Sequence, residues 1–321
     1  MPNILFASNS VSHFVGSEIS NLSWGYDANR VPYAIKAPNE TVISSPNFAE
    51  TTTDNTWFHF TFGSDAWYVN NDEPICEIVD IDGERIIRFS CRDSINFGWR
   101  LQTNIDGNVN NYYRVFPIPE SRRMSCDVRI GLTGVQARVE VFVNEMRIFD
   151  VTYAIASHKK PRALWLGGMS NNGNPVNQLF SEIIVADGDT RNARLDLLRP
   201  ISAGAYGNWD GPLSSLSDDD PTTGMTTTSA AQNQSTILTP YTGANNISNI
   251  VQVTTSVRGI NSPTQLQHLV RMSAVDYLTS SFAVPFEKDY QITDWTLNPA
   301  TSLPWAAADI ETAEFGFKSI A

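Results

Sequence analysis

The sequence has 321 residues, 41% of them hydrophobic, which is enough for one large domain or two ordinary ones and excludes wholesale disorder. Its 22 basic and 34 acidic residues leave a net charge of −12, and only five of the basic residues are lysines. This balance argues against binding to nucleic acid or to an anionic membrane surface.

The N-terminal stretch contains no basic residue before Arg30, so it lacks the pattern of a secretory signal. No run of residues approaches the ~18 apolar positions of a membrane span. We therefore expect a soluble protein that is made in the cytoplasm without an export signal of its own and that does not insert into a membrane.

Short strands joined by tight turns are predicted through most of residues 57–185. Asp82-Gly83 predicts a hairpin between strands at 77–81 and 85–91. Apolar and polar residues alternate over 124–130 and again over 139–143, and Asn144-Glu145 predicts the turn into a strand at 146–149. Further strands are predicted at 99–101, 112–118, 163–166 and 180–185. Such spacing is typical of a β-sandwich or jelly roll.

The composition changes near residue 190. Residues 190–198 predict about two helical turns, and residues 201–234 are rich in Gly, Ser, Thr and Asp, which places a domain boundary near Ala203. Alternation returns at 251–257 and 266–272, followed by a helical turn at 305–310 and a last strand at 315–317. We predict an all-β fold with two β-sandwich (jelly-roll) domains, residues 1–203 and a smaller 204–321, and one or two short helices.

Metal and thiol chemistry find little support in the sequence. Cys76, Cys91 and Cys126 each lie in a strand-like run and are expected to be small buried hydrophobes, and His59 a satisfied strand histidine. No cofactor is expected. The acidic groups at 187–189 and 218–220 offer oxygen ligands for Ca²⁺, but a cap for the following helix and a solvated linker explain them better.

No catalytic motif stands out. The chain lacks G-x-G-x-x-G, a P-loop, G-x-S-x-G and H-E-x-x-H. The acidic clusters at 287–289 and 309–314 approach a sandwich-type glycosidase pattern, but neither supplies the acid and nucleophile that retaining hydrolysis needs. We therefore predict no enzymatic activity and no catalytic residue.

Aromatic residues beside amides give the only candidate ligand site. Trp67 and Tyr68 are followed by Asn70, and two asparagines precede Tyr112 and Tyr113. Aromatic rings stack on sugar C–H faces while amides bond to hydroxyl groups, so these residues are candidates for a glycan contact. The same residues also suit a sandwich core or a subunit interface.

Three local patterns in the sequence resemble bacteriophage virion proteins. Residues 3–12, NILFASNSVS, resemble the starts of tailed-phage tail and fibre proteins. Residues 82–86 (DGERI), 141–144 (VFVN) and 180–191 (FSEIIVADGDTR) are similar to concanavalin/laminin-G-type jelly rolls, although Glu145 stands where a glycine is expected. Residues 298–305 (NPATSLPW) and 314–318 (EFGFK) resemble the closing segment of small phage-virion sandwiches. The resemblance implies binding of glycans or proteins and carries over no catalytic residue.

The leading hypothesis is a structural protein of a tailed-phage virion, in the tail tip, baseplate or fibre, that binds host-surface glycan through several copies. Its partners would be other copies of itself, other virion proteins and glycan. Open sheet edges with few lysines favour an oligomer, and the resemblance to fibres favours a trimer. The alternatives are a capsid decoration or head-fibre protein that stabilises the shell, a glycan depolymerase, and a bacterial lectin outside any phage.

Overall fold

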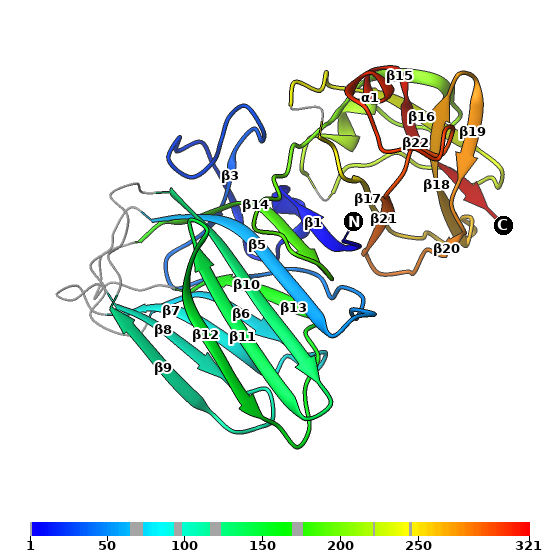
Figure 1. The fold of residues 1–321 in the computed structure, drawn as a ribbon. Helices are drawn as coiled ribbons and strands as arrows, with labels where there is room; N and C mark the ends of the chain where they lie inside the picture. The colour runs from blue at the N-terminus through cyan, green and yellow to red at the C-terminus, as the bar shows by residue number, and fades with distance from the viewer. Residues whose placement is uncertain are drawn as a thin grey trace. The chain divides into compact units, whose positions relative to one another are not determined.

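The computed structural model describes residues 2–64, 73–92, 98–115, 123–168, 176–220, 222–243 and 246–321. The chain is nearly all β and divides into two compact units, Pro2–Asp196 and Leu197–Ala321 (Figure 1). The prediction of an all-β fold with short helices is confirmed. In the described part of the chain, no helix has the length and apolar character needed to cross a membrane.

Two antiparallel sheets form the first unit. The eight-stranded sheet has the order β12-β11-β10-β5-β14-β3-β2, with β1 paired to β14, and the six-stranded sheet has the order β4-β13-β6-β7-β8-β9. The larger sheet consists of β1 (Ile4–Ser8), β2 (Glu18–Ser20), β3 (Ala34–Ala37), β5 (Asn55–Ser64), β10 (Arg123–Thr133), β11 (Gln136–Val143), β12 (Met146–Ala154) and β14 (Gln178–Ala186). The smaller sheet consists of β4 (Val42–Ser44), β6 (Glu73–Val79), β7 (Arg85–Arg92), β8 (Gly98–Thr103), β9 (Asn110–Val115) and β13 (Ala163–Gly167), and a 3₁₀ turn, η1, spans Val11–His13.

The core of the first unit lies between these two sheets, which face each other (Figure 1). Phe149 of β12 reaches across to Phe89 of β7, with ring centroids 6.5 Å apart, and Phe89 stacks on Trp99 of β8. The three cysteines are buried, as predicted. Burial of these apolar side chains from both sheets is the main source of stability for such a sandwich.

The two predicted hairpin turns are present. Gly83 adopts a φ of +79°, and the Asp80 carboxylate accepts hydrogen bonds from the backbone N–H groups of Asp82 and Glu84. At the β11–β12 turn, Asn144 and Glu145 have φ of +48° and +66°. A two-residue turn of this kind needs positive φ at both positions, so Glu145 holds a backbone conformation that glycine adopts more easily.

The predicted helix over residues 190–198 is wrong, because the segment contains a turn at 191–192 and then neither helix nor strand up to residue 199. Asp189 accepts a hydrogen bond from the Arg191 N–H, which closes a turn at the start of the segment. Further along, Leu195 N–H donates to Glu182 and Arg30 pairs with Asp196. These contacts with the rest of the first unit outweigh the weak preference of so short a helix.

The second unit contains a six-stranded sheet of order β15-β16-β22-β18-β19, with β20 paired to β18, and a two-stranded sheet β17-β21. Its elements are β15 (Pro200–Gly207), η2 (Leu213–Leu216), β16 (Asn233–Leu238), β17 (Ile250–Ser256), β18 (Gln265–Met272), β19 (Val275–Leu278), β20 (Phe282–Ala283), β21 (Asp289–Trp295), α1 (Ala307–Thr312) and β22 (Glu314–Ile320). The strands predicted at 251–257, 266–272 and 315–317 and the helical turn near 305–310 are present.

Polar contacts of His268 and Gln252 join the sheets of the second unit. Buried His268 of β18 lies 2.7 Å from Thr293 Oγ1 and 3.0 Å from Thr254 Oγ1, on β21 and β17 respectively. Gln252 of β17 donates to the backbone oxygen of Gly316 in β22. Gly316 is required there, because a Cβ would lie 1.8 Å from the backbone oxygen of Gln234 in β16.

The division between the units precedes the predicted position. It falls after Asp196, whereas the boundary predicted at Ala203 lies inside strand β15. The pattern of β15 is easily missed, because small residues fill Pro200–Gly207 and leave no apolar alternation. Leu198, just before this strand, packs against the core of the second unit.

Candidate functional site

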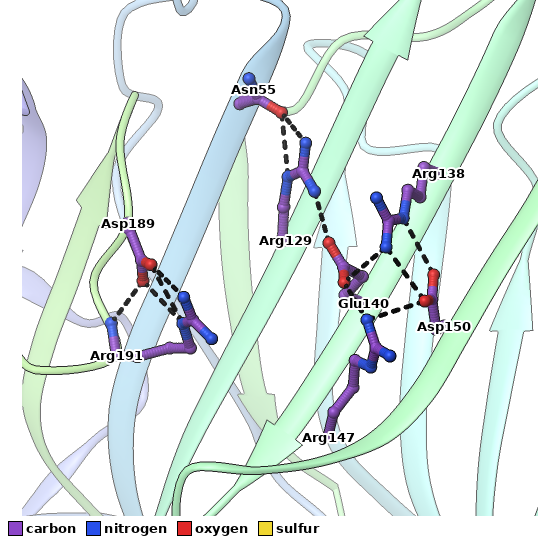
Figure 2. Close-up of polar contacts among 8 residues, drawn as sticks. All are labelled: Asn55, Arg129, Arg138, Glu140, Arg147, Asp150, Asp189 and Arg191. Atoms are coloured by element: carbon purple, nitrogen blue, oxygen red, sulfur yellow. Dashed lines mark hydrogen bonds and ion pairs between the residues drawn. The ribbon is translucent and has the colours of Figure 1, made fainter.

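An open pocket of about 460 Å³ lies on the eight-stranded sheet and is the site best supported by the structure. We call it the arginine pocket. Figure 2 shows the polar side chains in and beside it. Its lining consists of Trp57, Arg129, Arg138, Glu140, Phe142, Glu145, Arg147 and Arg191.

Strand register brings these residues together from positions far apart in the sequence. Residues directly opposed on neighbouring antiparallel strands project from the same face of a sheet. Two adjacent rows across β5, β10, β11 and β12 build the site: Trp57, Arg129, Glu140 and Asp150 form one row, and His59, Asp127, Phe142 and Arg147 the other.

A β-bulge at Ile148 places Arg147 on the same face of β12 as Asp150. Glu140 opposes Asp150 in the β11–β12 pair, but Phe142 opposes Arg147, so β12 has one extra residue between them. Residues three apart in a regular strand point to opposite faces. The bulge instead places Arg147 and Asp150 on one face, where Arg147 Nη1 lies 2.8 Å from an Asp150 oxygen.

Three arginines surround the carboxylate of Glu140, which is almost fully buried (Figure 2). Arg129 donates to one oxygen, while Arg138 and Arg147 lie 3.0 and 3.1 Å from the other. Arg138 also forks onto Asp150, and this hydrogen bond holds the pKa of Asp150 below its ordinary value. Glu140 thus fixes the positions of three guanidinium groups at once.

Arg191 reaches the pocket from the segment after β14. It binds the carboxylate of Asp189, which lowers the pKa of that carboxyl, and its guanidinium lies 4.8 Å from the Phe142 ring centroid. Phe142 stacks on Trp57 with ring centroids 6.0 Å apart. The floor of the pocket is therefore aromatic, and a cation covers it.

A buried hydrogen-bond chain holds this segment on the sheet. Asp127 Oδ1 accepts a hydrogen bond from the Thr190 hydroxyl at 3.0 Å and lies 2.9 Å from His59 Nδ1. His59 and Asp127 are fully buried, and Thr190 almost so. The sequence predicts a satisfied strand histidine at His59, but only its Nδ1 has a hydrogen-bond partner among the described residues, and its buried Nε2 has none. The contact between His59 and Asp127 completes this hydrogen-bond chain, which has a structural role directly beside Arg191.

The predicted glycan residues lie elsewhere or outside the described part. Trp67, Tyr68 and Asn70 are not among the described residues. Tyr112 and Tyr113 lie on β9, at the edge of the six-stranded sheet, and as neighbours in a strand they face opposite sides. Tyr112 is partly buried, which raises its pKa, whereas Tyr113 is 49% exposed beside the guanidinium of Arg100. Their part in glycan binding stays a prediction.

The acidic groups considered for Ca²⁺ have protein partners. The Asp187 carboxylate accepts hydrogen bonds from the backbone and side chain of Asn3, and Asp189 binds Arg191. In the linker, Asp218 accepts from Thr223, and Asp220 from Thr222. Across the described residues, no three His, Cys, Asp or Glu side chains are grouped so that they could hold a metal ion.

Sequence reasoning missed the arginine pocket. Single-strand alternation shows that Arg129 and Arg138 point away from the core, but only the pairing of strands shows that they converge on Glu140. One signal was available: polar-face arginines at 129, 138 and 147 recur on successive strands of a predicted meander. The bulge at Ile148, which completes the cluster, leaves no recognisable pattern in the sequence.

No family model and no curated protein matches this sequence. Among solved structures, the chain is similar to the receptor-binding domain of botulinum neurotoxin type G (TM-score 0.37, 8% identity, 56% of this chain and 42% of that one). It is also similar to the Caenorhabditis elegans galectin LEC-6 (TM-score 0.31, 12% identity, 46% of this chain and 94% of that one). A third similar structure is alginate lyase AlyC3 (TM-score 0.35, 8% identity, 48% of this chain and 75% of that one). The chain spans less than half the length of the neurotoxin domain.

Proposed function

We propose that this protein is a structural component of a tailed-phage virion, in the tail tip, baseplate or fibre, and that it binds host-surface glycan through the arginine pocket. The observation that carries the binding role is the pocket itself, in which guanidinium donors are arranged over an aromatic floor. Placed polar donors on an apolar base are the usual composition of a small-ligand site.

The virion assignment is supported by the resemblance of residues 3–12, 180–191 and 298–318 to phage proteins. Residues 180–191 form β14 and the following turn, which contributes Thr190 and Arg191 to the pocket and its anchor. Residues 180–191, which carry part of the resemblance to phage proteins, therefore overlap the candidate site.

We propose binding rather than cleavage. Of the acidic residues considered for hydrolysis, Glu314 accepts hydrogen bonds from Ser235 Oγ and from the Ala205 N–H. These contacts tie its strand, β22, to β16 and β15, which supports a structural role for this carboxylate.

The full-length protein can be tested on a panel of bacterial surface polysaccharides. We expect retention of at least one polysaccharide, and loss of that signal in Arg147→Gln but not in Tyr113→Ala. Loss in Tyr113→Ala alone would move the site to β9, and retention of no polysaccharide would overturn the glycan-binding role.

A cryo-EM map of the virion tests the location. Density for this chain in the tail tip, baseplate or fibre, in contact with other copies at threefold symmetry, is the expected result. Density on the capsid would favour a decoration or head-fibre protein, and absence from the particle would overturn the virion assignment.

A further inference from the structure

We propose that the arginine pocket is specific for a carboxylate-bearing sugar of the uronic acid type. This inference rests on the proposed glycan binding and names the chemical class of the ligand. It depends on which guanidinium N–H groups are already engaged and which are available to a ligand.

Arg147 offers the best-placed donors. Its side chain is 49% exposed, and its contacts with Glu140 and Asp150 both use Nη1. In the described part of the chain, no group contacts Nε or Nη2, which form the opposite edge of the guanidinium. That edge presents two parallel N–H groups, and a carboxylate accepts such a pair with both of its oxygens.

Two neighbouring arginines add single donors. Arg138 uses Nε and Nη2 to bind Asp150 and Glu140, and Arg191 uses Nε and Nη2 to bind Asp189. Nη1 of each has no partner among the residues that the structure describes, and both side chains are at least 40% exposed. Three exposed guanidinium groups, two from the β11–β12 hairpin and one from the segment after β14, therefore line one pocket.

The guanidinium N–H groups that have no partner in the described part of the chain and the floor of the pocket both favour an anion. Four arginines and two glutamates line it, although the whole chain carries a net charge of −12. Asp150 and Asp189 beside the pocket balance the excess positive charge, so the formal charges of these eight side chains sum to zero. Beneath the arginines, Trp57 and Phe142 are 7% and 5% exposed, and an apolar floor strengthens the attraction between charges above it. A neutral sugar has no carboxylate to accept the two parallel N–H groups of Arg147.

The test is calorimetric titration of the full-length protein with an oligouronate and with the same oligosaccharide after its carboxyl groups are reduced to alcohols. We expect the oligouronate to bind at least about tenfold more tightly than its reduced form. Arg147→Gln should lose at least about tenfold in affinity for the oligouronate. The affinity of Arg147→Lys should lie between those of the wild type and Arg147→Gln, because lysine keeps the positive charge but not the pair of parallel N–H donors. Arg85→Gln is the matched control, since Arg85 is a similarly exposed arginine paired with Glu77 on the other sheet.

Each other outcome overturns the inference. Equal binding of the two oligosaccharides, or an equal loss in Arg85→Gln, would show that no carboxylate is recognised at this pocket. Tighter binding of a sulfated oligosaccharide or of an oligoglutamate peptide at equal charge would assign the pocket to another anion. Binding of neutral polysaccharides alone would overturn this inference and leave the proposed glycan binding intact, whereas binding of no glycan would overturn both.

Discussion

Thr190 donates a hydrogen bond of 3.0 Å to Asp127, and both side chains are buried. The same Asp127 oxygen contacts His59 on the neighbouring strand. Thr190 directly precedes Arg191, so this bond determines where Arg191 lies over the aromatic floor. The buried polar chain and the exposed pocket are thus parts of one arrangement.

We predict that Thr190→Val loosens the segment that carries Arg191. Valine has nearly the shape of threonine but no hydroxyl, so Asp127 loses a donor inside the protein, at a cost of about 1–2 kcal/mol in the free energy of unfolding. Faster amide hydrogen exchange at residues 189–194 and a lower urea midpoint would show the effect. Thr190→Ser keeps the hydroxyl and should behave like the wild type, and equal exchange in all three proteins would contradict the anchoring role.

Glu140→Gln should weaken folding and strengthen anion binding. The substitution removes the charge that Arg129, Arg138 and Arg147 share, and we expect a loss of about 1–3 kcal/mol. The loss stays below that of a fully buried pair because these arginines are a quarter to a half exposed and solvent screens them. Urea unfolding and titration with an oligouronate give the two readouts.

Glu77→Gln is the matched control for that substitution, since Glu77 pairs with Arg85 and Arg88 on the six-stranded sheet. It should leave oligouronate affinity unchanged. Weaker binding in Glu140→Gln than in the wild type would mean that ordering of the arginines matters more than net charge.

Acid should destabilise the second unit through His268. Burial lowers the pKa of this histidine from 6.5 to about 4, so the unfolded chain binds a proton at a higher pH than the folded one. Stability is therefore complete above pH 6.5 and falls as the pH drops toward 4, by about 3 kcal/mol from this group. Unfolding measured between pH 4 and 7 should show a smaller pH dependence in His268→Gln, and identical slopes would contradict the prediction.

The unit boundary predicts which fragment folds. A fragment of residues 197–321 keeps Leu198 in its core and the whole of β15, whereas 204–321 lacks Leu198 and half of that strand. We expect 197–321 to give a dispersed amide spectrum and a higher melting temperature than 204–321. Equal melting temperatures would show that the first residues of β15 contribute nothing.

The β architecture could be predicted because its signals are local. Asp82-Gly83 marks a turn by conformational preference alone, and alternation at 124–130 records one buried face of a strand. The helix expected at 190–198 failed because contacts with distant residues, such as Arg30 with Asp196, decide the structure of that segment. The boundary was predicted inside β15 because this strand has the composition of a linker.

The site was harder to predict for a different reason. Arg129, Glu140 and Asp150 lie on three strands and meet only through the pairing register, which no single strand reveals. The aromatic residues were predicted as a site because they are close together in the sequence. Tyr112 and Tyr113 are consecutive residues of strand β9, so their rings lie on opposite faces of the sheet.

The extra residue in β12 also marks a position where the strand can change its length by one codon without turning the pocket residues away. Removing Ile148 would leave Arg147 two positions before Asp150, so both side chains would still project from the pocket face and Arg147 would still oppose Phe142. The strand could still pair with β11, because its backbone hydrogen bonds do not depend on the bulge. Related chains could therefore gain or lose the bulge by a single in-frame insertion or deletion at this position, while the arginine pocket persists.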